Sequence, residues 1–307
     1  NLAAIKPAPG DEAQPFTHFL RLATPSFTPA PPDTAMTFTP EPIAGTTHWN
    51  WIGAISLSDT GAPIVATANA TQVHLATGAT LPFPGGPANT PPQPEGVLPL
   101  DFNYDFKTDL VLAGAGGVRF FRQDKPDTFT DVTAQTKLPK PILNASYTGA
   151  WAVDIEADGD LDIVLASSSG QPTVLRNNGD NTFTPIAPFA GVAGVHGFVW
   201  ADLNGDGNPD AAILDAANHL HVFRNARSGR FVEVPVPTET GTLKAITAAD
   251  ASHNGILDLL AVREDGAILR LAATDAWAWA TSEVAHVPDA SYLAGEVRLH
   301  AADLDNN

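Results

Sequence analysis

Residues 202–210 have the sequence D-L-N-G-D-G-N-P-D, with oxygen-bearing side chains at loop positions 1, 3, 5 and 9 and glycine at position 6. A hard cation such as Ca²⁺ takes about six to eight oxygen ligands. Alternating side chains on a tightly curled loop supply four of them, and the backbone carbonyl at position 7, here Asn208, supplies another. Gly207 permits the sharp bend because it has no Cβ. The chemistry predicted for this stretch is the binding of a calcium ion.

The residues after this loop exclude an EF-hand. An EF-hand loop ends with a bidentate Glu at position 12 and continues as a helix. Position 12 is here Ile213, inside the short apolar run Ala211–Leu214, which is followed by turn residues. Such a run predicts a buried strand. The loop is therefore expected to join two strands.

The same spacing recurs along the chain, with position 1 at Asp101, Asp154, Asp202, Asp250 and Asp303. The predicted ligands, counting the carbonyl of position 7, are Asp101, Asn103, Asp105, Lys107 and Asp109; Asp154, Glu156, Asp158, Asp160 and Asp162; Asp202, Asn204, Asp206, Asn208 and Asp210; Asp250, Ser252, Asn254, Ile256 and Asp258; and Asp303, Asp305 and Asn307. One such loop alone can be an ordinary turn, since Asp, Asn and Gly are turn formers. Repetition of Asp at position 9, directly before an apolar run, favours metal binding, because an ordinary turn does not require it. Structural Ca²⁺ is favoured over Mg²⁺, because Mg²⁺ prefers a tighter octahedron.

Three departures from the pattern are visible. Phe106 replaces the glycine of position 6 in the loop at 101–109, and Ser252 and Asn254 replace stronger ligands in the loop at 250–258. An earlier copy at 56–64 has Thr60 and Ile64 at positions 5 and 9, so no metal is predicted there.

The elements that position these loops repeat with them. An apolar run, Gly197–Ala201, precedes the loop, and a buried strand, an alternating strand at His219–Arg224 and a last strand at Arg230–Val234 follow it. Four short strands in about fifty residues, repeated, are typical of a β-propeller blade. We therefore predict an all-β chain with a Pro/Ala-rich linker at 1–35 and a propeller at 36–307, comprising five complete blades and a partial sixth.

These loops and strands resemble the FG-GAP/VCBS repeats, which are also found in the head of integrin α subunits. The resemblance covers about residues 45–307. It implies a propeller of typically seven blades, with calcium between the first and second strands of a blade and ligand binding through other loops. Residues Met36–Pro42 resemble a fourth strand, which can pair with C-terminal strands and so hide the sheet edges. One or two blades downstream are expected, and a closed six-bladed ring is the alternative.

Charge narrows the range of partners. The formal net charge is −18, which argues against nucleic acid and anionic membranes. No apolar run is long enough to span a membrane. The chain has no cysteine, so disulfides do not indicate its compartment. Calcium loops of modest affinity favour an exported protein, whether extracellular, on the cell surface or periplasmic.

No catalytic motif is visible in the sequence, and the aspartates are accounted for by the loops. We therefore predict a non-enzymatic binding or adhesion module that recognises a protein or a glycan. A propeller scaffold of a carbohydrate-active enzyme, with its site at the central channel, and a structural spacer in a larger surface protein remain alternatives. Trp277 and Trp279 share one face of a strand, where packing between blades is favoured over stacking on a sugar.

Overall fold

The computed structural model of the protein describes residue 39 and residues 48–58, 61–227 and 229–302. Residues 43–302 form one compact unit. The predicted linker at 1–35, the predicted ligands Asp303, Asp305 and Asn307, and all of the predicted strand at 36–42 except Thr39 lie outside the described residues.

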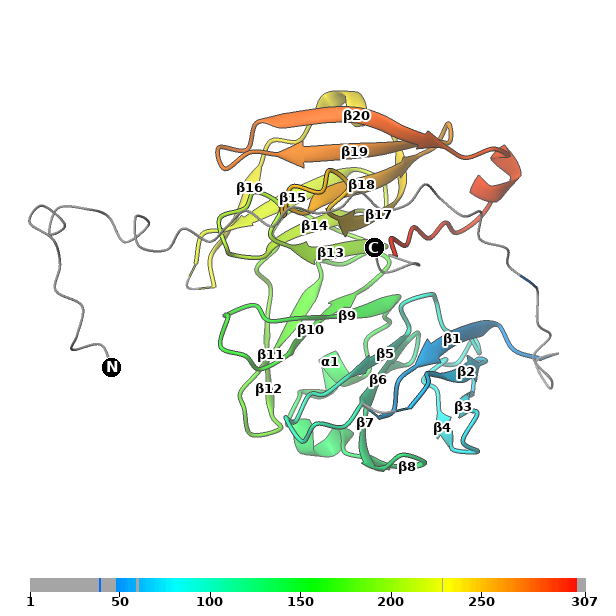
Figure 1. Ribbon diagram of the computed structural model, residues 1–307. Coiled ribbons are helices and arrows are strands. Elements are labelled where there is room, and N and C mark those ends of the chain that lie inside the picture. The colour runs from blue at the N-terminus through cyan, green and yellow to red at the C-terminus, as the bar shows by residue number, and fades with distance from the viewer. Residues whose placement is uncertain (1–38, 40–47, 59–60, 228, 303–307) are drawn as a thin grey trace, which may run out of the picture. The chain divides into compact units, whose positions relative to one another are not determined.

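The compact unit contains five four-stranded antiparallel sheets, here called blades 1 to 5, and the strands of each sheet follow one another in chain order (Figure 1). Blade 1 comprises β1 (Trp51–Ile55), β2 (Ile64–Ala68), β3 (Gln72–Leu75) and β4 (Thr80–Pro82). Blade 2 comprises β5 (Val97–Leu100), β6 (Asp109–Gly114), β7 (Gly117–Lys125) and β8 (Thr128–Asp131). Blade 3 comprises β9 (Gly149–Val153), β10 (Asp162–Ala166), β11 (Thr173–Asn177) and β12 (Phe183–Ile186). Blade 4 comprises β13 (Gly197–Ala201), β14 (Asp210–Leu214), β15 (Leu220–Asn225) and β16 (Phe231–Val234). Blade 5 comprises β17 (Leu243–Ala249), β18 (Asp258–Arg263), β19 (Ala267–Ala273) and β20 (Trp279–His286). The five complete blades predicted and their strand order are confirmed. The predicted partial sixth blade is not confirmed, because residues 296–302, which precede Asp303, form no strand and residues 303–307 lie outside the described part of the chain.

The second strand of a blade is a continuous apolar run in the sequence because both of its faces are buried. Every residue of β10 is buried, and successive side chains of a strand point to opposite faces. Ile163 and Leu165 enter a core with residues of blade 2, whereas Val164 and Ala166 enter a core with residues of blade 4. A strand with neighbours on both faces needs apolar side chains at every position.

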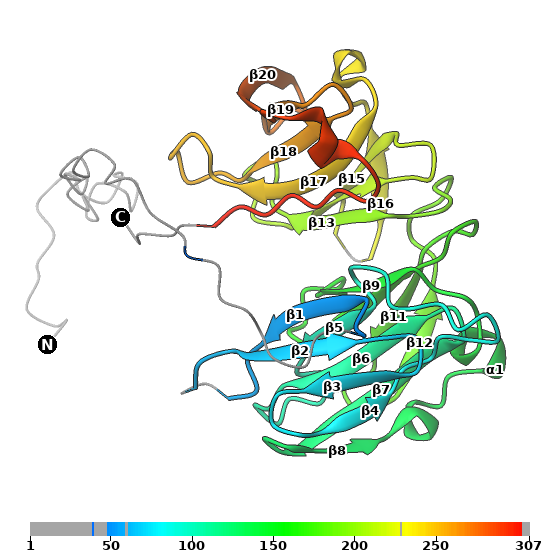
Figure 2. The same ribbon diagram turned by 90° about the vertical axis from the view of Figure 1, so that its right-hand side faces the viewer.

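The hydrophobic cores lie between consecutive blades. Four clusters of buried side chains join blade 1 to 2, 2 to 3, 3 to 4 and 4 to 5. Among the described residues no cluster joins blade 1 to blade 5, and both views show these two sheets apart (Figure 2). Each sheet is thus stabilised mainly by its neighbours in the chain.

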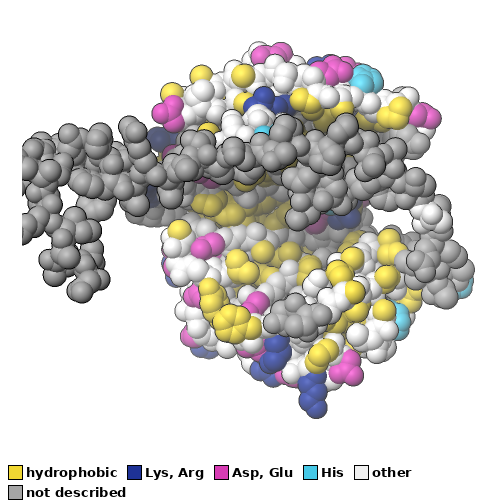
Figure 3. Space-filling view, in the orientation of Figure 1, with side chains coloured by type: hydrophobic (Ala, Val, Ile, Leu, Met, Phe, Trp, Pro, Cys, Tyr) yellow, Lys and Arg dark blue, Asp and Glu magenta, His cyan; other side chains and the backbone are white. Residues whose placement is uncertain are grey.

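Helical segments are short in the described part of the chain. They are α1 (Lys140–Leu143) and the 3₁₀ turns η4 (Thr133–Thr136), η5 (Thr238–Thr240) and η6 (Ala290–Leu293). No helix among the described residues has the length and apolar character needed to span a bilayer. On the face shown in Figure 3, Lys and Arg side chains are few and scattered among acidic ones, in keeping with the net charge of −18.

Candidate metal centres

Four of the five loops that the sequence singled out, those beginning at Asp101, Asp154, Asp202 and Asp250, join the first and second strands of blades 2 to 5, as predicted. In the loop at 202–210, the carboxylate of Asp202 accepts hydrogen bonds from the backbone N–H groups of Gly205, Asp206 and Gly207, at 2.9, 3.1 and 2.8 Å. The position-5 side chain, Asp206, accepts from the N–H of Asn208 at 2.9 Å. The first aspartate therefore curls the backbone around its own carboxylate, which is how Asx side chains build turns.

The other loops have the same internal bonds. The N–H groups of positions 5 and 6 donate to the position-1 carboxylate, and the N–H of position 7 donates to the position-5 side chain, in the loops at 101–109, 154–162 and 250–258. Position 4 has a positive φ in each, from Tyr104 (62°), Ala157 (57°), Gly205 (74°) and His253 (55°). The four loops, which share the same spacing of oxygen-bearing residues, thus share one backbone conformation.

Position 9 is the buried end of the loop. Asp109, Asp162 and Asp210 are at most 2 % exposed, and each begins the second strand of its blade. Their Oδ1 atoms accept from the backbone N–H of the third strand, at Gln123, Asn177 and Asn225. In blades 3 and 4 the Oδ2 atom also accepts from the N–H of position 2.

Burial next to other carboxylates changes the protonation of these aspartates. Desolvation raises the pKa of Asp109 to about 7, and those of Asp162 and Asp210 to about 6, in spite of the backbone hydrogen bonds. Repulsion from the carboxylates at positions 5 and 1 of the same loop adds to the rise of each pKa. Positions 1, 5 and 9 therefore converge closely enough to repel one another, and a divalent cation would reverse that repulsion.

The donor set of these three loops fits a hard cation. Oδ2 of Asp109 is a buried oxygen that has no hydrogen-bond partner, and an uncompensated buried acceptor of this kind is costly. Carboxylate and amide oxygens at positions 1, 3, 5 and 9 are the ligands that Ca²⁺ takes. Within the described ranges, no three Asp, Glu, His or Cys side chains gather at coordinating range, and this includes the side chains of these loops. The roles assigned to these loops as metal ligands stay predictions.

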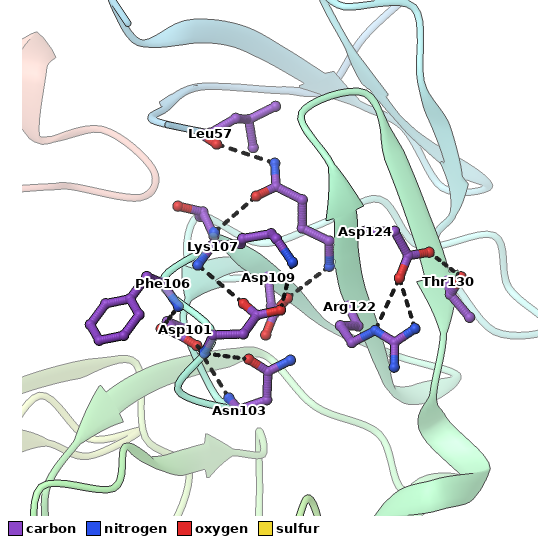
Figure 4. Close-up of polar contacts among 12 residues, drawn as sticks. Leu57, Asp101, Asn103, Phe106, Lys107, Asp109, Arg122, Asp124 and Thr130 are labelled. Carbon is purple, nitrogen blue, oxygen red and sulfur yellow. Dashed lines mark hydrogen bonds and ion pairs between the residues drawn. The ribbon is translucent and has the colours of Figure 1, made fainter. Parts of the chain in front are cut away.

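The loop at 101–109 differs at two positions (Figure 4). Nζ of Lys107 lies 2.9 Å from Oδ2 of Asp105, and both side chains are partly exposed. Phe106 adopts a φ of 62° where the sister loops have Gly159, Gly207 and Gly255, and its ring points away from the carboxylates. This ring is 89 % exposed and lies edge-on to that of Tyr104, which is 56 % exposed.

The loop at 250–258 departs at position 9. Asp258 is 3 % exposed, and its Oδ2 accepts a hydrogen bond from Nε of Arg270 at 2.7 Å. Oγ of Ser252, at position 3, is buried and has no hydrogen-bond partner.

In blade 1, the ends of the loop at 56–64 pair as in the other blades, but the position-9 aspartate is missing. Ile64 pairs with Ile55, just as Asp210 pairs with Ala201 in blade 4. An apolar residue therefore stands where the other blades place a buried aspartate. Thr60 lies outside the described residues.

Sequence reasoning missed the amide side chains that link consecutive blades. Nε2 of Gln123 donates to the carbonyl of Leu57 in blade 1, and Nδ2 of Asn177 donates to the carbonyl of Phe102 in blade 2. Both carbonyls belong to position 2 of the preceding blade's loop. The signal was the recurrence of an amide side chain 14 or 15 residues after the position-9 aspartate.

A cavity of about 390 Å³ lies beside the first strands of blades 3 to 5 and was also not predicted. It is lined by Trp151, His196, Lys244 and the ion pair of Glu95 with Arg298, whose oxygen and nitrogen are 2.6 Å apart. Burial lowers the pKa of His196. The charges that line the cavity are mixed and do not define one substrate.

The two neighbouring tryptophans of the fifth blade pack against protein, and they do not share one face of a strand as predicted, because β20 begins at Trp279 and Trp277 precedes it with a φ of 60°. Trp277 and Trp279 lie against the core between blades 4 and 5, and Nε1 of Trp279 donates to the carbonyl of Pro235.

The five sheets and the loops that recur in four of them define a β-propeller fold built from sequence repeats. Models of protein families match the chain as the FG-GAP-like repeat at residues 101–165, 154–213 and 202–261, which together span more than half of its 307 residues. The chain belongs to the FG-GAP repeat family.

Solved structures with similar folds were found, whereas no curated protein matches the sequence. A lectin of Agrocybe aegerita, described as specifically recognising non-reducing terminal N-acetylglucosamine, aligns with a TM-score of 0.53 and 20 % identity over 80 % of this chain and 69 % of the lectin. The Tc holotoxin pore of Photorhabdus luminescens aligns with a TM-score of 0.39 and 16 % identity, over 76 % of this chain and 12 % of the toxin chain. At these identities the comparison with the lectin shows the fold alone.

Proposed function

We propose that this protein is a calcium-stabilised propeller that acts outside the cytoplasm as a non-enzymatic binding or adhesion module for a glycan or a protein. The observation that carries the binding role is the exposed aromatic pair Tyr104 and Phe106 on the loop of blade 2. The ions are assigned to the loops at 101–109, 154–162 and 202–210.

Calcium is supported by the carboxylates of these loops. Each loop contains three or more of them in its sequence, and the one at position 9 is buried. Their mutual repulsion is relieved when a divalent cation binds, and ligands must be deprotonated to bind it. Because modest calcium sites are filled at extracellular rather than cytosolic concentrations, an exported protein fits them best.

The aromatic pair supports ligand binding because the presence of Phe106 does not stabilise the fold. A φ of 62° is unfavourable for phenylalanine, and the sister loops have glycine at this position. Strain of this kind persists at functional sites, and an exposed apolar side chain marks a surface for interaction. Aromatic faces stack on sugar rings and also anchor protein interfaces, so this pair suits either ligand.

The test is a binding screen of the purified protein against arrays of glycans and extracellular matrix proteins, in calcium and in chelator. Glycans come first, because a lectin with 20 % identity uses a similar fold to recognise terminal N-acetylglucosamine. We expect a ligand that binds in calcium, binds weakly in chelator and is lost on Phe106→Gly. Val284→Ala is the matched control, because Val284 is another exposed apolar residue and lies on β20. No binding by a folded, calcium-loaded protein would contradict the proposal.

A further inference from the structure

We propose that blade 5 carries its own cation: the guanidinium of Arg270 takes the place of a metal ion, so the loop at 250–258 binds no calcium. This inference rests on the calcium sites assigned to blades 2 to 4. It replaces the sequence-based prediction for Asp250, Ser252, Asn254, Ile256 and Asp258.

The contact is a buried carboxylate paired with a fixed positive charge. Nε of Arg270, on β19, lies 2.7 Å from Oδ2 of Asp258. In blades 3 and 4, the corresponding Oδ2 atoms of Asp162 and Asp210 accept only backbone N–H groups, from Ile155 and Leu203. Arginine does not lose its charge at physiological pH, so Arg270 is a permanent positive charge beside this carboxylate.

The position of Arg270 is equivalent in every blade, because the second and third strands pair in the same register. Leu260 pairs with Arg270 in blade 5. The corresponding pairs are Val111 with Phe120, Val164 with Val174, and Ala212 with Val222. Phe120, Val174 and Val222 are fully buried apolar residues. In these four blades, a positive charge replaces an apolar side chain only beside the loop with the fewest carboxylates.

The number of carboxylates also separates the loop of blade 5 from the loops of blades 2 to 4. The loops at 101–109 and 202–210 have three carboxylates each and that at 154–162 has five, whereas that at 250–258 has two, one of them paired with Arg270. Affinity for Ca²⁺ depends on the number of charged ligands. The unpartnered hydroxyl of Ser252 adds an oxygen but no charge, so a dication there would face a net charge of about −1.

Lys107 shows why the burial of the carboxylate matters. It also pairs with a predicted ligand, Asp105, but the two side chains are 42 % and 32 % exposed. An exposed pair of this kind contributes little and separates readily. Asp258 is 3 % exposed, so removing its only charged partner leaves a buried uncompensated carboxylate.

The experiment is calcium stoichiometry by equilibrium dialysis, with folding checked by circular dichroism. Wild type should bind three ions, Asp202→Asn two, and Asp250→Asn still three. Arg270→Val, which introduces the residue type of blades 3 and 4, should gain a fourth and weaker ion that is lost again in Arg270→Val/Asp250→Asn. Calcium should also raise the Tm of Arg270→Val more than that of wild type, because the ion replaces the missing charge on Asp258.

The outcomes separate the two claims. Loss of an ion on Asp250→Asn in an otherwise wild-type chain overturns the inference, and does so even if Arg270→Val fails to fold. A stoichiometry of three for a folded Arg270→Val overturns the role of Arg270. A wild type that binds no calcium at all refutes the proposed calcium sites themselves, and the role of Arg270 as a substitute falls with them.

Discussion

Phe106 combines two unfavourable properties in one residue. Its backbone is in the left-handed region, and its ring is 89 % exposed. Both properties lower the stability of the folded state relative to glycine at this position. The left-handed conformation alone costs a non-glycine residue about 1 kcal/mol or more. Phe106 therefore lowers the stability of the fold relative to glycine. This is why we assign Phe106 to the proposed ligand-binding surface.

Phe106→Gly should raise the free energy of unfolding by up to about 1 kcal/mol, since relief of backbone strain outweighs the greater entropy of glycine in the unfolded chain. Urea denaturation in saturating calcium measures this change. Gly207→Ala, which puts a Cβ at a φ of 82°, should be destabilising and serves as the opposite control. A loss of stability in Phe106→Gly would show that the ring packs against the protein.

The buried aspartates predict an unusual dependence of stability on pH. Burial raises the pKa values of Asp109, Asp162 and Asp210 to between about 6 and about 7, from a usual value of 3.8. Between about pH 4 and pH 7 the folded state then holds more protons than the unfolded state, so the stability of the calcium-free protein falls as pH rises.

Thermal unfolding in chelator should therefore give a lower Tm at pH 8 than at pH 5. In saturating calcium this trend should disappear or reverse, because the ion binds the deprotonated carboxylates. Asp162→Asn, which does not titrate, should weaken the trend in chelator. A Tm in chelator that rises with pH would contradict the assigned pKa shifts.

At the residue scale, the sequence predicted the loop positions but not their electrostatic surroundings. The spacing of Asp202, Asn204, Asp206 and Asp210 was sufficient, because the side chain at position 1 organises the backbone locally. The partner of Asp258 was not predictable in the same way, since Arg270 is placed beside it only by the register of β18 with β19.

The link between consecutive blades is the main feature at the scale of the elements. The side-chain nitrogen of Asn177 donates at 2.9 Å to the carbonyl of Phe102, in the preceding blade, and at 3.2 Å to that of Leu161. A buried carbonyl left without a donor costs about 1–3 kcal/mol. The residue thus ties the third strand of one blade to the loop of the preceding blade.

Asn177→Ala should lower the free energy of unfolding by about 1–3 kcal/mol, measured by urea denaturation in calcium. The matched control is Asn225→Ala in blade 4, where the side-chain oxygen accepts only from the exposed N–H of Arg227, so the loss should be smaller. Equal losses in the two variants would show that the contact between blades adds nothing.

At this scale the strands were predictable because each has a simple pattern. The run at 211–214 and the alternation at 219–224 gave β14 and β15 to within about one residue at either end. The hydrogen bonds from Gln123 and Asn177 were not predictable, because they join residues 66 and 75 positions apart in the chain.

For the whole molecule, three bound ions would make stability depend on calcium. A site filled at about 100 times its Kd adds about 2.7 kcal/mol to the free energy of unfolding. Excess chelator should therefore lower the Tm by several degrees or more in calorimetry, and excess Mg²⁺ should restore little of it. Asp158→Asn, which keeps an oxygen at position 5 but loses its charge, should reduce the effect. A Tm unmoved by chelator would contradict structural calcium.

The repeat period predicted the five blades because a fifty-residue unit with four strands has few other solutions. The predicted pairing of residues 36–42 with C-terminal strands stays a prediction, because these residues, except Thr39, lie outside the described part of the chain. The position of the cavity depends on how successive blades turn against each other, which no local pattern encodes.

The second strand of blades 2, 3 and 4 contributes side chains to two cores at once. A blade therefore has no hydrophobic core of its own. The unit repeated in the sequence is one sheet, whereas the unit of packing is the core between two consecutive sheets. Duplicating or deleting one whole repeat in the gene adds or removes one sheet together with one complete interface. The remaining interfaces keep their partners, so a chain of this design can change its length by copying alone, without any new packing surface having to evolve.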